Sequence, residues 1–169
     1  MTEVQEVTQH PALLEDIGRE CLHSIRIAHS RHPIGRYTCL MHVFDFTEKP
    51  EYIAIADYGL GRVFAGVDFA HRLIEKGFLT EVSQAEAENG DLVAYFREGN
   101  FKHVGLWQPN GRVLSKWGVG HLYDHALFEV PESYGTAVRF YDALSYEAAY
   151  ELFVQFAQEN GIPFENADP

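Results

Sequence analysis

A cysteine and a histidine, far apart in the chain, are the residues whose types could do chemistry together. Cys39 follows Thr38, a residue that can cap a helix, so we expect Cys39 in a first helical turn, where unpaired N–H groups favour a thiolate. His103 lies within an apolar segment and can accept the thiol proton. A thiolate that attacks a carbonyl while an imidazole moves the proton is the machinery of acyl transfer. The pair predicts a cysteine hydrolase that cleaves an amide bond through a Cys39 thioester, with His103 as general base.

Three short strands are predicted around His103. Segments 90–96, 102–107 and 111–118 are rich in β-branched, aromatic and aliphatic residues, and Gly, Asn and Pro separate them. If 109–111 is a three-residue hairpin loop, Gly105 lies opposite Ser115, and Ser115 shares a face with His103. Its hydroxyl can accept a hydrogen bond from the imidazole, so this register brings Ser115 within reach of His103.

Helices are predicted on both sides of these strands. Apolar residues spaced by three and four favour a helix from Pro11 to about His29, with Cys21 on its buried stripe. Other helices are expected at 38–46, 66–77 and 145–160, with a further strand at 134–141, while 52–64 fits a short helix or a loop. The chain is thus predicted to be one α+β domain over 1–169, mainly helical in 1–77, a sheet in 90–141 and a C-terminal helix in 145–160.

Composition excludes several classes of protein. The net charge is -12 and the 13 Lys and Arg residues form no block, which argues against nucleic acid as a partner. The sequence contains no apolar run of membrane-spanning length and no signal-peptide pattern at its start, so we expect a cytoplasmic protein, or one exported by a signal-independent route, with no membrane partner. Its two cysteines suit neither a disulfide scaffold nor a paired zinc site, and no cofactor or metal is expected.

The order of these motifs resembles that of a known family. A cysteine at a helix start is followed by Gly90-Asp91-Leu92-Val93, by His103-Val104-Gly105 and by an Asn110-Gly111 turn, and over roughly 37–118 this is similar to the NlpC family of papain-like cysteine peptidases. The resemblance implies a papain-like fold, with N-terminal helices packed on a central antiparallel sheet. It also implies Cys39 and His103 as the catalytic pair, and the peptide stem of peptidoglycan as the substrate.

Two positions depart from the family pattern. The family usually has Asp or Asn before the nucleophile and His, Asn or Gln about twelve residues after the histidine, where this chain has Thr38 and Ser115. The resemblance thus implies Ser115 as the third catalytic residue. A second resemblance covers Ser115-Lys116-Trp117-Gly118, His125 and Tyr134-Gly135, which are similar to the closing half of uncharacterised bacterial proteins that begin with a cysteine-bearing helix. It implies no activity.

Other side chains are expected around the site. Tyr37, Trp117 and His125 are predicted to bind substrate, and His42, one helical turn after Cys39, is placed to tune the thiol or pack beside it. His121 and His125 have the spacing of an inverted zinc-peptidase motif, but the segment is short and has no third ligand downstream, so we favour a short helical turn in which His125 bonds to the backbone or helps wall the site.

An alternative function requires no catalysis. With Thr38 and Ser115 at the two departing positions, the same fold could serve as a catalytically degenerate binding or regulatory protein whose acidic surface engages a basic partner. The sequence leaves the oligomeric state open.

Overall fold

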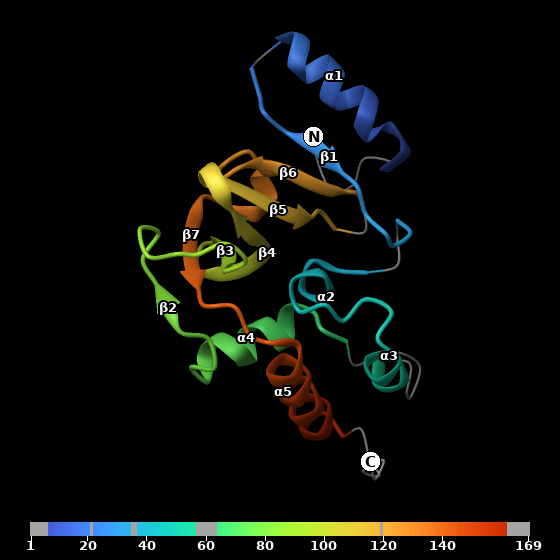
Figure 1. Cartoon of the computed structure of the whole chain (residues 1–169), viewed down its shortest axis with the longest axis vertical. Coiled ribbons are helices and arrows are strands. Elements are labelled where there is room, and N and C mark those ends of the chain that lie inside the picture. Colours follow the sequence, from blue (N-terminus) through green and yellow to red (C-terminus); the bar gives the residue numbers. More distant parts are fainter. Residues whose placement is uncertain (1–6, 21, 35–36, 57–63, 119, 162–169) are drawn as a thin grey trace.

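The computed structural model describes residues 7–20, 22–34, 37–56, 64–118 and 120–161 (Figure 1). The first part of the chain contains η1 (Val7–Gln9), α1 (His10–Glu20), β1 (Arg26–Ala28), α2 (Cys39–Val43), α3 (Pro50–Ala56) and α4 (Val67–Glu75). The remainder contains β2 (Glu81–Val82), β3 (Leu92–Arg97), β4 (Asn100–Gln108), η2 (Pro109–Gly111), β5 (Arg112–Lys116), β6 (Leu122–Ala126), η3 (Glu132–Tyr134), β7 (Ala137–Tyr141) and α5 (Tyr146–Glu159). None of the helices in these ranges is long and apolar enough to cross a membrane.

The strands form one antiparallel sheet in the order β1-β6-β5-β4-β3-β7-β2. This sheet, together with the C-terminal helix α5, confirms the α+β prediction. The predicted hairpin register is also confirmed, because Gly105 pairs with Ser115 and Gln108 pairs with Arg112. Ser115 therefore lies on the face of the sheet that the sequence predicted.

Glycine is required at two places in this sheet. A Cβ atom at Gly105 would lie 2.6 Å from Cγ1 of Val113 and 2.7 Å from Cβ of Ser115, so only a glycine lets β4 and β5 pair here. Gly135 has φ +85°, and a Cβ atom there would lie 2.2 Å from the carbonyl oxygen of Phe96. These close approaches hold β5 and the segment before β7 against the middle of the sheet.

Each face of the sheet has its own hydrophobic core. The helix-side core joins α2 to α5 with one face of β3 and β4, and includes Leu40, Phe44, Phe69, Phe153, Ala94 and Val104. The far-side core includes Leu14 of α1, Trp117 directly after β5, Tyr134 of η3, and alternate strand residues, namely Val93, Tyr95, Val113, Tyr123 and Phe140. Figure 1 shows α2, α3, α4 and α5 gathered together on one side of the strands and α1 beside β1 and β6. The two cores follow from the two-residue period of a strand, which sends successive side chains to opposite faces.

Side chains cap the two helices where caps were predicted. The Oγ1 atom of Thr38 accepts a hydrogen bond from the Met41 N–H at 3.2 Å, and donates to the Ala65 carbonyl at 3.0 Å. Ser145 accepts from the Ala148 N–H at 3.2 Å at the start of α5. These bonds fix where α2 and α5 begin, and place Cys39 as the first residue of α2.

The first predicted helix is too long, because it was expected to continue to about His29. α1 ends at Glu20, and Arg26–Ala28 forms strand β1, which pairs with β6. The apolar spacing that suggested helix in 25–28 is outweighed by pairing with β6, and Ser24 is held in place by the Glu129 carboxylate through bonds of 2.7 and 2.6 Å. The prediction for Cys21 lies outside the described residues.

Other predicted elements differ in their bounds. The segment 121–125, expected to be a helical turn, contains most of strand β6, and the strand expected at 134–141 begins at Ala137. The helix expected over 38–46 ends at Val43. In the undecided segment 52–64, α3 occupies the beginning, and 57–63 lies outside the described residues. α4 lies within the helix predicted over 66–77.

Candidate functional site

Cys39 begins α2, the helix that packs on β4 and β5. The side chain is half-buried, carries a thiol rather than a disulfide, and packs against the helix-side core. Thr38 determines this position, because the hydroxyl that caps α2 also bonds to Ala65 in the segment before α4. A half-buried thiol fixed to the sheet in this way is positioned to act as a nucleophile.

Lys116, at the end of β5, is the most unusual charged residue near Cys39. Its exposed fraction is 0%, its Nζ atom donates a hydrogen bond to the Gly120 carbonyl, and it lies 4.4 Å above the centre of the Tyr37 ring. Burial lowers the pKa of Lys116 to about 8, while its electrostatic interaction with Cys39 acts in the opposite direction. At pH 7 about nine in ten molecules therefore still carry the ammonium.

His42 lies on the same helix as Cys39, one turn further on. Burial lowers its pKa to about 4, and the positive charges of Lys116 and His32 add to the effect. Its Nε2 atom is buried and has no hydrogen-bond partner among the described residues. The imidazole is therefore neutral at pH 7, with a ring nitrogen available to a ligand or a proton.

His103 is buried in the middle of the sheet, with an exposed fraction of 1%. Its ring stacks on Tyr134 with 4.0 Å between the centroids and an interplanar angle of 11°. Burial holds the pKa of His103 well below its ordinary value, helped by His125 and His42. Within the described part of the chain its Nε2 atom has no hydrogen-bond partner, so it is a neutral imidazole with an unused nitrogen.

The two predicted catalytic residues come from elements in contact but pack on different faces. His103 pairs with Tyr95, a residue of the far-side core, whereas Cys39 packs against the helix-side core. No hydrogen bond joins Nε2 of His103 to the Cys39 sulfur in the described structure. Cys39 interacts electrostatically with Lys116 instead, and the positive charge of Lys116 in turn helps lower the pKa of His42.

Ser115 has a different partner from the predicted one. Its hydroxyl lies 2.8 Å from Nε2 of His125 and accepts the Trp117 indole N–H at 2.9 Å. Because Nδ1 of His125 lies 2.8 Å from the Ala126 carbonyl, Nδ1 must carry the proton, and the Ser115 hydroxyl donates to Nε2. The prediction of a His125 bond to the backbone is confirmed, but Ser115 is bonded to His125 and not to His103.

The side chains predicted to bind substrate are buried. The Tyr37 hydroxyl bonds to Oγ of Ser30 at 2.7 Å, Trp117 stacks on Tyr123 at 4.2 Å between centroids, and His125 lies inside the sheet. Tyr37 lines a small pocket of about 190 Å³, together with Ala28, Ser30, His32, Ile34, Gly120, His121 and Leu122. Of the three residues, only Tyr37 lines a described pocket.

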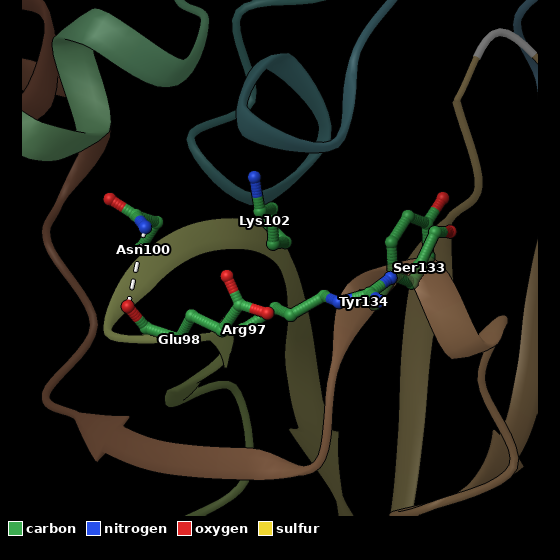
Figure 2. Close-up of a pocket in the computed structure, with 6 residues that line it drawn as sticks. All are labelled: Arg97, Glu98, Asn100, Lys102, Ser133 and Tyr134. Carbon is green, nitrogen blue, oxygen red and sulfur yellow. Dashed lines mark hydrogen bonds between the residues drawn. The ribbon is translucent and has the colours of Figure 1, made fainter.

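A larger pocket of about 490 Å³ lies beside Tyr134 (Figure 2). It is lined by Arg97, Glu98, Asn100, Lys102, Ser133 and Tyr134. Tyr134 joins the pocket to the site because its ring stacks on His103. Figure 2 shows the Lys102 side chain directed from β4 toward the ribbon of α2. Two basic side chains make this pocket suited to an anionic group, although the protein as a whole is acidic.

The zinc alternative is not supported by the strand geometry. His121 and His125 lie at and within β6, where residues four apart are ~13 Å from each other, too far to share one ion. Among the described residues no three His, Cys, Asp or Glu side chains gather as a metal site.

Sequence reasoning missed the role of Lys116. The signal was available, because a lysine in an alternating strand beside Ser115 must point to the face opposite the one that Ser115 occupies.

Comparisons with protein families, curated proteins and solved structures found no match. The candidate site is therefore defined by its own geometry.

Proposed function

We propose that the protein is a cysteine hydrolase of papain-like architecture that cleaves an amide bond, with Cys39 as nucleophile and His103 as general base. The observation that carries this proposal is a buried ammonium, on Lys116, that interacts electrostatically with Cys39. It is accompanied by two neutral imidazoles with buried, unpartnered Nε2 atoms, on His42 and His103. A cation favours the thiolate and a neutral imidazole accepts a proton, which are the two requirements of thiol-based acyl transfer.

The reaction divides into two balanced steps. The Cys39 sulfur adds to the carbonyl carbon of the amide while the imidazole holds the thiol proton, and collapse of the adduct breaks the C–N bond as that proton passes to the leaving amine. Water then adds to the thioester, releasing a carboxylic acid and restoring the thiol. The Cys39 backbone N–H is the proposed donor to the oxyanion.

His103 must approach Cys39 for this chemistry. A base acts at about 3 Å, or through one water, and catalytic hydrogen bonds often form only when substrate is bound. The unused Nε2 atom supports the proposal, because a buried nitrogen without a partner costs about 1–3 kcal/mol, a cost that a new hydrogen bond would remove. Stacking on Tyr134 fixes the ring plane and leaves its edge available.

The pocket beside Tyr134 suggests the class of substrate. Arg97 and Lys102 line it, and in this acidic protein they favour a substrate that carries a carboxylate. A peptidoglycan stem peptide, which has free carboxylates beside its amide bonds, meets that requirement.

Turnover of stem-peptide amides, measured as release of a primary amine, tests the proposal. We expect hydrolysis by the wild-type chain, loss of hydrolysis in Cys39→Ser, and a large fall in kcat in His103→Gln with Cys39 still open to alkylation. His71→Gln, a substitution on α4, is the matched control and should retain activity. Equal, slow iodoacetamide labelling of Cys39 and of Cys21, with no amine released, would reject the hydrolase.

One observation favours a second candidate, a catalytically degenerate binding protein. Ser115 and His125 are bonded to each other and to neighbouring groups, so neither orients His103. Without an orienting partner the imidazole is a weaker base, and the acidic protein would instead bind a basic partner. Salt-sensitive binding of a polylysine peptide, together with absent amide hydrolysis, would favour the binding function over the hydrolase.

A further inference from the structure

Lys116 carries a charge that the interior of a protein does not normally hold. Lysine is almost never fully buried unless it is paired, because removing an ammonium from water costs several kcal/mol. The exposed fraction of Lys116 is 0%, yet among the described residues no carboxylate forms an ion pair with it. A buried cation without a carboxylate requires another source of stabilisation.

The described contacts satisfy only part of this charge. The ammonium has three N–H donors, and the Gly120 carbonyl accepts one of them. The Tyr37 ring, 4.4 Å from Nζ, adds a cation–π contact, which stabilises a desolvated ammonium by about 2 kcal/mol at most. The ammonium retains donors for a further, negatively charged group.

The groups that face Lys116 identify that partner. Tyr37 and Cys39 approach it from the start of α2, His42 from the same helix, and Gly120 from the loop after β5. Tyrosine ionises only near pH 10 and histidine supplies no negative charge, whereas a thiol ionises near pH 8.5.

The carboxylate that interacts with His42 is already engaged. Asp45 interacts with His42, but its carboxylate forms an ion pair of 3.1 Å with Lys49. Among the described groups facing Lys116, Cys39 is therefore the one that can become an anion near neutral pH.

We propose that the Lys116 ammonium is the counter-charge of a Cys39 thiolate, so that the two residues form a buried ion pair in the resting protein. In the resting protein the thiol proton passes to solvent and the ammonium keeps its own proton. In turnover the imidazole takes up a proton from solvent in its place and gives it to the leaving amine, so no other reactant is needed. The pair acts as a unit in titration, since each charge stabilises the other. Its role in turnover rests on the proposed hydrolase function, but its effect on thiol reactivity does not.

The test is the pH dependence of Cys39 alkylation by iodoacetamide, followed by mass spectrometry of the labelled peptide. In the wild-type chain we expect half-maximal labelling at a pH below the ordinary 8.5 of a thiol. Lys116→Met keeps the length of the side chain and removes its charge, and should slow labelling at pH 7 about tenfold, the effect of one pH unit in the thiol pKa. Lys116→Arg keeps the charge and should lie between the two.

Lys49→Met is the matched control, because Lys49 is also a cation near α2 but pairs with Asp45. Its labelling profile should equal that of the wild type. A Lys116→Met profile identical to that of the wild type, in a folded protein, would overturn the ion pair.

A reciprocal measurement leaves Lys116 unchanged. If Lys116→Met does not fold, the side-chain NMR signal of Lys116 is titrated in the wild type and in Cys39→Ala. Loss of the thiolate should lower the pH at which the ammonium titrates, and an unchanged midpoint rejects the pair.

These outcomes separate the ion pair from the hydrolase. A shifted labelling profile without turnover supports the pair and rejects the hydrolase. Turnover in the wild type with an unshifted Lys116→Met profile supports the hydrolase and overturns the pair.

Discussion

Ser115 and Lys116 are neighbours in β5, but their side chains enter opposite environments. On the far side of the sheet, Ser115, Trp117 and His125 form a network in which every described polar side-chain atom has a partner. On the helix side, Lys116 is a buried ammonium with no carboxylate ion pair in the described structure, and His42 has an unpartnered nitrogen. A satisfied network stabilises a fold, whereas buried groups with unused bonding capacity are usually found where a protein acts.

This difference between the two faces of the sheet indicates that the candidate site is centred near α2. The sequence directed attention to the face of His103 and Ser115, where the register was correct but the serine is engaged elsewhere. The helix side holds the thiol, the cation and a neutral imidazole together. The strand register places His103 on the far face of the sheet. Its unpartnered Nε2 atom is the reason to include it in the proposed catalytic site.

Removal of the Cys39 thiol is expected to have the largest effect on activity. Cys39→Ser should reduce amide hydrolysis by at least ~10³-fold, because an alcohol is a far weaker nucleophile than a thiolate. The circular dichroism spectrum should not change, since the side chain is only half-buried. The rate of amine release measures the effect, and retained turnover would place the nucleophile elsewhere.

Lowering the pH should reduce the stability of the protein through His42, on the helix side of the sheet. The unfolded chain binds a proton at His42 near pH 6.5, but the folded chain does so only near its pKa of about 4, so the free energy of unfolding falls as pH drops through this window. The difference corresponds to about 3 kcal/mol.

Urea unfolding at pH 7 and pH 4 measures this effect. His103 and His125 contribute in the same direction, so the readout is the difference between wild type and His42→Gln. An equal loss of stability in both proteins would show that His42 titrates normally.

Breaking the far-side network should affect stability more than activity. Ser115→Ala leaves Nε2 of His125 and the Trp117 indole N–H buried without their partner, at a cost of about 2 kcal/mol in the free energy of unfolding. Ser83→Ala, which removes an exposed serine bonded to Glu86, is the control and should have little effect. Denaturant titration measures both, and a loss of kcat without loss of stability would return Ser115 to the catalytic machinery.

The smallest effect is expected at the pocket beside Tyr134. Lys102→Ala should raise KM for a carboxylate-bearing peptide about threefold and leave an amidated analogue unchanged, because an exposed charge contributes less than about 1 kcal/mol. Lys76→Ala, at the end of α4, is the control. Steady-state kinetics at two salt concentrations check this, and equal effects on both peptides would exclude a carboxylate subsite.

Much of the central sheet could be predicted from the sequence because its signals are local. The β3, β4 and β5 strands are rich in β-branched, aromatic and aliphatic residues, turn residues separate them, and a three-residue loop fixes the register of β4 and β5. Thr38 and Ser145 cap helices through side chains that bond to nearby backbone. Cys39 at a helix start followed directly, since a cap and the residue after it need no distant partner.

The partner that each of these residues contacts is determined by the tertiary structure. Arg26–Ala28 is a strand because β6 lies beside it, and helical spacing in the sequence could not reveal that pairing. Ser115 bonds to His125 because β6 pairs with β5 in the register that brings their side chains together. The environment of Lys116 arises from α2 packing over β5 and from the loop at Gly120. Alternation determines that neighbouring residues face apart, but the sequence alone does not say what covers each face, because those contacts form between segments distant in the chain.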